Sequence, residues 1–205
     1  MSSTTIHINN KANYLFTKSF ESYGEVSIRT FRISQDSKVL HEWVNQDYAV
    51  FWGMQGTTLQ EVEQEYANLQ QPEHYDVFVG VYEEQPVFVL ERYHPQKDDV
   101  GTLYFAKNDD CGIHIIVAPP TVKIPNFTWY LFNTIMEFVF QDKTINRILV
   151  EPDIRNKKMF ALCQRIGFTL DKIVELPHKT AQLAFLERHI YQQLKFLPTI
   201  NKRSA

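Results

Sequence analysis

The chain has 205 residues, of which 44% are hydrophobic, and a formal net charge of −3. Its length fits one domain with a core of its own, and its slightly acidic charge argues against nucleic acid as a partner. Its two cysteines give no disulfide framework, its N-terminus shows no signal-peptide pattern, and no apolar run reaches the ~18–20 residues of a membrane span, so we expect a cytoplasmic protein.

The N-terminal part of the chain predicts an arm, a strand and a helix. We expect residues 1–23 to form a flexible N-terminal arm, which leaves room for one short strand at Thr5–Ile8. Alternating apolar and polar residues predict a half-buried strand over Glu25–Ile33. Apolar residues at helical spacing then predict a helix over Ser34–Asn45, with Ser34 as its N-cap.

A second helix and a hairpin follow. Thr58 and Glu61 match the capping-box pattern, so we expect a helix from there to about Leu69. The runs His74–Tyr82 and Pro86–Tyr93 are rich in β-branched and aromatic residues, and only Glu-Glu-Gln separates them. These two runs predict a β-hairpin.

The second half of the chain alternates strands and helices. Gly112–Ala118 is almost wholly apolar, as expected of a central strand covered on both faces. A long aromatic helix over Phe127–Phe140 and a short buried strand over Arg147–Val150 follow. The next helix spans Asn156–Ile166 and has Gly167 at its C′ position. The two closing strands are Phe168–Leu176 and Thr180–Glu187.

In chain order, these elements predict one α/β (α+β) domain with a single mixed central sheet of about seven strands and helices on both faces. We place this domain at residues 24–198, with a C-terminal tail at 199–205. No internal repeat or low-complexity segment divides it.

The end of this order carries a family motif. Asn156 is followed at +11 and +12 by Gly167 and Phe168, which resembles the second conserved motif of the GNAT acyltransferases, and the order of elements is that of a GNAT fold. Four blocks also resemble the signature of the siderophore-biosynthesis branch of that family, which acylates hydroxylysine or lysine. The blocks are Phe51-Trp52-Gly53-Met54, Gly112-Ile113-His114, Glu151-Pro152-Asp153 with Arg155-Asn156, and Leu176-Pro177-His178-Lys179-Thr180-Ala181. The similarity covers roughly residues 27–190.

The resemblance implies splayed strands and a catalytic pair. In a GNAT fold the fourth and fifth strands, here Gly112–Ala118 and Arg147–Val150, part from each other, and the thioester of acyl-CoA lies between them. By motif position the catalytic residues are His114 and Asp153. Histidine titrates near neutral pH and can accept a proton from the attacking nitrogen. Asp153 is then expected to orient the imidazole or to hold the substrate nitrogen.

Both residues also have a structural interpretation. A single histidine in an apolar strand is usually a core residue bonded to a neighbour, and Asp153 stands where a carboxylate stabilises a helix N-terminus. The helix explains Asp153 but leaves His114 unexplained, so the pair favours catalysis. Histidine and carboxylates also bind metals, but we see no third ligand at suitable spacing and expect no metal.

The resemblance also implies a co-substrate, acetyl-CoA or another acyl-CoA. The loop before the aromatic helix departs from the family pattern, because it has no glycine and three prolines, which lack amide donors. Asn126 stands where some members of the siderophore branch, whose loop resembles this one, carry glycine, and asparagine tolerates left-handed geometry, so we expect the turn to survive. The residues expected to bind the co-substrate are Ile116, Val117, Lys123, Asn126, Phe127, Thr128 and Asn156.

Three more residues are candidates for the acceptor site. Trp52 lies between the first two helices, where GNAT enzymes contact their acceptor, although a ring that seals these helices onto the sheet explains it equally well. Lys179 is expected to meet a substrate carboxylate or CoA phosphates, or to pair with Glu151 or Asp153. Glu151 follows the fifth family strand, beside the catalytic pair. Cys163 replaces a tyrosine that many members carry, and we expect it to pack in the core.

We therefore expect an acyl-CoA-dependent N-acyltransferase that converts an N-hydroxylated amine, of the hydroxylysine or hydroxy-diamine type, into a hydroxamate for siderophore assembly. One alternative is acylation of an unmodified small amine or lysine. An alternative of another class is a non-catalytic GNAT-fold module that binds acyl-CoA or a partner, which the glycine-free loop suggests. The sequence leaves open the acyl group and whether the protein is a homodimer.

Overall fold

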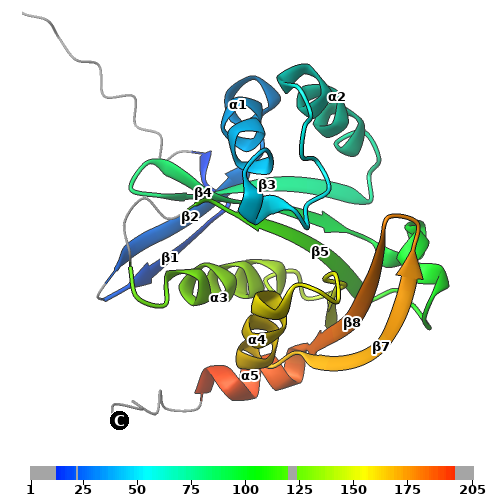
Figure 1. The fold of residues 1–205 in the computed structure, drawn as a ribbon. Coiled ribbons are helices and arrows are strands. Elements are labelled where there is room, and N and C mark those ends of the chain that lie inside the picture. The colour runs from blue at the N-terminus through cyan, green and yellow to red at the C-terminus, as the bar shows by residue number, and fades with distance from the viewer. Residues whose placement is uncertain (1–12, 22, 120–123, 197–205) are drawn as a thin grey trace, which may run out of the picture.

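The computed structural model describes residues 13–21, 23–119 and 124–196. The strand considered at Thr5–Ile8 and the expected tail at 199–205 lie outside these residues. Within them the chain forms one mixed sheet with helices on both faces, as the sequence predicts (Figure 1).

The sheet has eight strands in the spatial order β1-β2-β3-β4-β5-β6-β8-β7. The strands are β1 (Phe16–Phe20), β2 (Gly24–Thr30), β3 (Tyr75–Tyr82), β4 (Gln85–Tyr93), β5 (Asp110–Val117), β6 (Arg147–Val150), β7 (Thr169–Leu176) and β8 (Lys179–Glu187). Neighbouring strands pair antiparallel, except β5 and β6, which are parallel. The residues of β1 fall within the expected flexible arm, and for them that expectation is wrong, because they pair with β2.

Five α-helices accompany the sheet in the described part of the chain. They are α1 (Ile33–Val44), α2 (Leu59–Leu69), α3 (Phe127–Val139), α4 (Lys157–Ile166) and α5 (Arg188–Phe196). Thr58 caps α2 through both halves of the expected capping box, and Gly167 ends α4 at a φ of 109°, which glycine adopts without steric cost. The expected N-cap at Ser34 is wrong, because α1 begins at Ile33. None of the helices built from described residues has the length and apolar character needed to cross a membrane.

Different helices cover the two faces of the sheet. α1 and α2 pack on one face, and α3, α4 and α5 pack on the other (Figure 1). Because side chains alternate along a strand, Val89 and Ile116 face α1 and α2, whereas Leu90 and Ile113 face the opposite layer. The central strands are therefore buried on both sides, as the apolar run in β5 predicts.

β5 and β6 part after a short stretch of pairing. Their pairing runs only from Asp110 opposite Arg147 to Gly112 opposite Leu149. β5 nevertheless stays paired with β4 as far as Val117. The last part of β5 therefore borders an opening in the sheet, and the splay of the fourth and fifth family strands is confirmed.

α5 is an element that the sequence analysis missed. It follows β8 directly, and the guanidinium of Arg188 donates hydrogen bonds to the backbone oxygens of Phe140 and Ile145. The ring of Tyr191 stacks on that of Phe140, with ring centroids 5.4 Å apart. α5 thus closes the layer that α3 and α4 form.

Candidate active site

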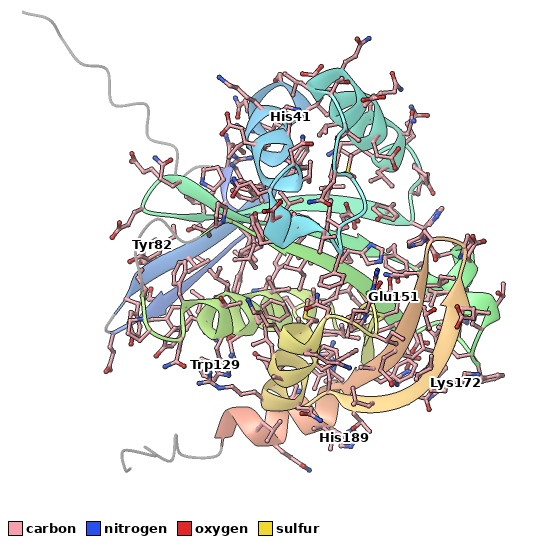
Figure 2. All side chains as sticks on the ribbon, viewed as in Figure 1. His41, Tyr82, Trp129, Glu151, Lys172 and His189 are labelled. Atoms are coloured by element: carbon pink, nitrogen blue, oxygen red, sulfur yellow. The ribbon has the colours of Figure 1, made fainter. Side chains whose placement is uncertain are left out.

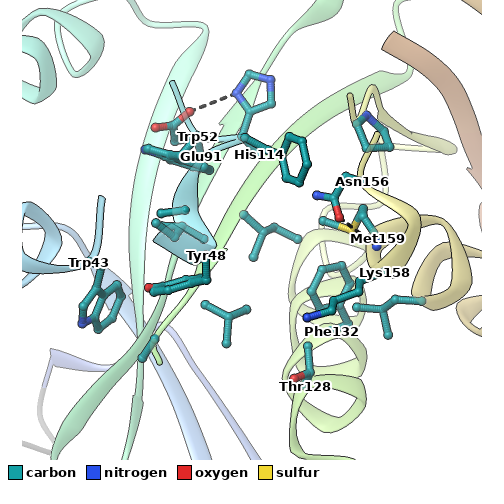
Figure 3. Close-up of a pocket in the computed structure, with 18 of the residues that line it drawn as sticks. Trp43, Tyr48, Trp52, Glu91, His114, Thr128, Phe132, Asn156, Lys158 and Met159 are labelled. Carbon is teal, nitrogen blue, oxygen red and sulfur yellow. Dashed lines mark hydrogen bonds and ion pairs between the residues drawn. The ribbon is translucent and has the colours of Figure 1, made fainter. Parts of the chain in front are cut away.

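A large cavity lies where the sheet opens between β5 and β6. It has a volume of about 2000 Å³, and its walls come from β5, the loop between α1 and α2, the turn between β7 and β8, and the first turns of α3 and α4. Figure 3 shows His114 and Glu91 on the side of β4 and β5, facing Asn156 and Lys158 at the start of α4. The cavity therefore joins residues from both sides of the split in the sheet.

His114 stands at the centre of a chain of charged groups. It lies on β5, directly opposite Glu91 of β4 in the sheet register. Its Nδ1 lies 3.0 Å from Oε2 of Glu91, as the dashed line in Figure 3 marks, and its Nε2 is hydrogen-bonded to Oε1 of Glu151. His114 therefore connects a carboxylate on β4 with a carboxylate that follows β6.

Glu91 is a buried carboxylate with three hydrogen-bond partners. Besides His114, it accepts hydrogen bonds of 2.7 Å from the hydroxyls of Tyr66 and Tyr75. Burial raises the pKa of Glu91, but the hydrogen bonds and charge of His114 and the two hydroxyls outweigh burial, so the pKa lies below its usual value. Sequence reasoning missed Glu91. A signal existed, because Glu91 shares the inward face of its predicted strand with Val89, where a charge requires partners.

Glu151 is the second carboxylate of the chain, and Figure 2 shows it inside the molecule, whereas Lys172 of β7 lies at the edge. Its Oε1 also lies 3.5 Å from Nζ of Lys179, so one of the interactions expected for that lysine is confirmed. Its Oε2 is buried, with no hydrogen bond within the usual distance among the described residues. Burial raises the pKa of Glu151, but the charge and hydrogen bond of His114, with Lys179, lower it to about 2.

The two carboxylates also set the acid–base state of His114. Burial lowers the pKa of His114, but the charge of Glu151 and the hydrogen bonds to Glu151 and Glu91 outweigh burial and raise it to about 10. The side chain is 32% exposed and borders the cavity. Its pKa therefore lies well above the neutral range that the sequence analysis assumed for a general base.

The packing around Gly112 explains why the Gly-Ile-His block begins with glycine. A Cβ at Gly112 would lie 2.2 Å from the ring of Tyr93, which occupies that space from β4. The Tyr93 ring packs in turn against the imidazole of His114, with ring centroids 5.0 Å apart. Glycine at this position therefore lets an aromatic ring support the histidine two residues further along the strand.

Asp153 does not pair with His114 as expected. Its two carboxylate oxygens accept hydrogen bonds from the guanidinium of Arg155 at 2.8 and 2.6 Å, and one oxygen also accepts the backbone N–H of Arg155. Arg155 accordingly lowers the pKa of Asp153 to about 2. Asp153 and His114 line the same cavity, but Glu91 and Glu151 orient the imidazole.

Trp52 borders the cavity beside His114. Its ring meets the imidazole edge-on, with ring centroids 6.5 Å apart, and it also packs against the core under α1 and α2. The neighbouring Phe51 lies under the guanidinium of Arg155, 5.6 Å from it. The loop between α1 and α2 therefore reaches the turn before α4 across the cavity.

Of the expected co-substrate residues, Ile116 and Val117 lie on β5, and the others that the structure describes lie along the wall formed by the first turns of α3 and α4. Asn126 adopts the left-handed conformation with a φ of 61°, so the expected survival of that turn is confirmed. Asn156 is the N-cap of α4 and accepts the N–H of Met159 at 3.2 Å. The expected residues that line the cavity are Ile116, Val117, Asn126, Phe127, Thr128 and Asn156. Lys123 lies outside the described residues.

The structure adds a cation to this wall that the sequence analysis did not single out. Arg165 of α4 donates a 2.9 Å hydrogen bond to Oδ1 of Asn126, and its guanidinium lies 5.1 Å from the ring of Trp129.

Cys163 is fully buried, and burial raises its pKa to about 12, so the expected core packing is confirmed. Among the described residues, no group of three or more His, Cys, Asp and Glu side chains is arranged to hold a metal ion.

Comparison with protein families and curated proteins gives a consistent result. A family model described as an acetyltransferase (GNAT) domain matches residues 32–176. N(6)-hydroxylysine O-acetyltransferase of Escherichia coli is 23% identical over 78% of this chain, which spans 52% of the length of that relative. N-hydroxyputrescine acetyltransferase of Acinetobacter baumannii is 22% identical, and the match covers 87% of this chain and 86% of that protein.

Solved structures share the fold. A crystal structure of an uncharacterized protein from Bacillus halodurans matches with a TM-score of 0.81 and 26% identity, over 87% of this chain and 92% of the other. The aminoglycoside acetyltransferase AAC(6')-Ib, solved in complex with coenzyme A, matches with a TM-score of 0.73 and 21% identity, over 83% of this chain and 99% of the other.

Proposed function

The chain belongs to the GNAT acetyltransferase family, and on this premise we propose that it transfers an acyl group from acyl-CoA to the nitrogen of an N-hydroxylated amine. The product is a hydroxamate, the iron-binding group of many siderophores. The names of the two curated relatives, a hydroxylysine and a hydroxyputrescine acetyltransferase, support this acceptor class. We further propose that the reaction serves siderophore assembly in the cytoplasm.

The observation that carries the proposal is the continuity of the cavity. One space reaches from the first turns of α3 and α4 to His114 and Glu151, through the opening between β5 and β6. A helix start offers N–H groups without intrahelical partners, which suit the phosphates of a CoA. A donor held there has its thioester near His114, and an acceptor enters beside Trp52.

The reaction balances without any other reactant. The nitrogen lone pair attacks the thioester carbonyl, the C–N bond forms and the C–S bond breaks. The nitrogen loses one proton and the CoA thiolate gains one, so the proton count balances. Asp153 stays a proposed catalytic residue, and holding the N–OH group would require it to give up one hydrogen bond to Arg155.

The acceptor class is tested by competition between N-hydroxycadaverine and cadaverine. At about pH 7 only roughly one in 10³ alkylamine molecules is neutral, because such amines have pKa values near that of lysine. Alkyl hydroxylamines are far less basic and arrive neutral. We expect a higher kcat/KM for the hydroxylated diamine at about pH 7, with a smaller preference at about pH 9, measured by mass spectrometry of the products.

The control is the same mixture without enzyme, because hydroxylamines react slowly with thioesters unaided. Equal or faster acylation of the plain diamine at about pH 7 would contradict the proposal and favour an ordinary amine acetyltransferase. Acetyl-CoA binding in calorimetry, without acceptor-dependent release of thiol, would favour the non-catalytic module.

Arg165 offers a test of the co-substrate wall. Arg165→Ala is expected to weaken acetyl-CoA binding by up to about fivefold at low salt, the range of an exposed ion pair. The loss should shrink at high salt, because ions screen the attraction to phosphate. Calorimetry at two salt concentrations measures both effects, with Lys172→Ala on the exposed part of β7 as the matched control. A loss that does not depend on salt would show that Arg165 acts through Asn126 and not on a phosphate.

A further inference from the structure

The hydrogen bonds around His114 constrain the number of protons on its ring. A neutral imidazole carries one N–H, so it donates at one nitrogen and accepts at the other. Here each ring nitrogen faces a carboxylate oxygen, Nδ1 that of Glu91 and Nε2 that of Glu151. An ionised carboxylate only accepts. Either both ring nitrogens carry a proton, or one carboxyl group does.

The neighbours of the two carboxyl groups decide between these cases. Glu91 already accepts hydrogen bonds from Tyr66 and Tyr75, which favour its ionised form. Glu151 lies beside the ammonium group of Lys179, which favours its ionised form as well. The extra proton therefore belongs on the histidine.

We infer that Glu91 and Glu151 are positioning residues that hold His114 as a doubly protonated imidazolium, so that the site meets its acceptor with a fixed positive charge in place of a base. This inference rests on the proposed acyl transfer and specifies how the same site treats its acceptor. Lys179, Glu151, His114 and Glu91 then form a chain in which positive and negative charges alternate.

The other groups near His114 are two aromatic rings, a second histidine and Asp153. Tyr93 and Trp52 present their rings to the imidazole. His178, in the turn between β7 and β8, has a pKa lowered by burial and by the positive charges of Lys179 and His114. Asp153, another carboxylate that lines the cavity, accepts its hydrogen bonds from Arg155.

The consequence for chemistry concerns the acceptor. An imidazolium whose two N–H groups bind carboxylates cannot take a proton from an ammonium ion. The nitrogen must therefore be neutral when it binds, and it loses its proton only after the C–N bond has made that proton acidic. The proton passes to the departing thiolate, directly or through water.

The protonation state is tested on the free enzyme by NMR of ¹⁵N-labelled histidines, between about pH 5.5 and 8.5, where an unperturbed histidine titrates. We expect His114 to keep the signals of two N–H groups throughout this range. In Glu151→Gln one acceptor for a charged N–H is replaced, and His114 should begin to titrate within this range. Glu91→Gln should act in the same direction.

Two outcomes decide the inference. A single N–H on His114 of the wild-type enzyme at neutral pH would overturn it, and this result does not require any variant to fold. A kcat/KM profile whose midpoint follows the titration of His114, and not the basicity of the acceptor, would overturn it too. If His114 keeps both protons but no hydroxylamine is acylated, the positioning role stands and the proposed function fails.

Discussion

Replacing His114 by glutamine is expected to lower kcat by roughly 10²–10³, the effect of removing one preorganised charged or donor group from a reaction centre. Glutamine keeps a hydrogen-bonding side chain of similar length, but it carries no charge between Glu91 and Glu151. The two carboxylates would then repel each other, and the carbonyl would lose a nearby positive charge. Steady-state kinetics with a saturating hydroxylamine acceptor measures the change.

The matched control is His189→Gln, because His189 lies on α5, away from the cavity (Figure 2). Acetyl-CoA affinity should stay close to that of the wild type in both variants, since His114 lies on the wall opposite Asn126 and Asn156. Turnover of a folded His114→Gln protein at the wild-type rate would show that the histidine has no part in the reaction.

The second large effect concerns stability. Glu151→Gln is expected to lower the free energy of unfolding by about 3–5 kcal/mol, the cost of breaking a buried ion pair by removing one partner. The side chain of Glu151 is only 3% exposed, and its loss leaves the positive charges of His114 and Lys179 near each other without the carboxylate between them. Urea unfolding, followed by tryptophan fluorescence, measures the difference.

The size of this difference should depend on pH. The pKa of Glu151 falls from 4.5 to about 2 on folding, so its contribution is complete above pH 4.5 and disappears as pH falls toward 2. The pKa of His114 rises from 6.5 to about 10, so its contribution is complete below pH 6.5 and disappears as pH rises toward 10. The difference between wild type and variant should therefore be largest between these limits, at pH 4.5–6.5.

The control for charge alone is Glu73→Gln, because Glu73 is exposed between α2 and β3. This variant should unfold within about 0.5 kcal/mol of the wild type at every pH, as is usual for surface substitutions. A Glu151→Gln difference that stays constant from acid to alkaline pH would contradict the ion-pair explanation.

The order of strands and helices was accessible from local patterns. The capping box at Thr58, the alternation in β2 and the apolar run of β5 each arise within a few consecutive residues. β1 was missed because its FTKSF sequence carries little of the pattern, and pairing with β2 is what makes it a strand. α5 was missed although Ile190, Tyr191 and Leu194 have helical spacing, because its sequence directly continues the closing strand.

The residues of the site also divide into those that local sequence predicts and those that depend on long-range contacts. His114 follows from a motif and from its place on a predicted strand. Glu91 could not be paired with it, because the register of β4 against β5 is set by long-range pairing across the connection at residues 94–109 and not by any local signal. Asp153 was assigned to the histidine, whereas its nearest cation, Arg155, stands two residues away in the sequence. The general lesson is that local order is readable and cross-strand partners are not.

The parting of β5 from β6 also bears on how the sheet is held together. The three residue pairs that join these strands are fewer than at any other junction in the described sheet, and they divide it into a group of five strands and a group of three. A donor bound in the opening would contact both groups of strands and so add interactions across the junction. Ligand binding to the folded state alone adds RT ln(1 + [L]/Kd) to stability. Acyl-CoA is thus expected to be a reactant that also stabilises the folded sheet, because it contacts both groups of strands.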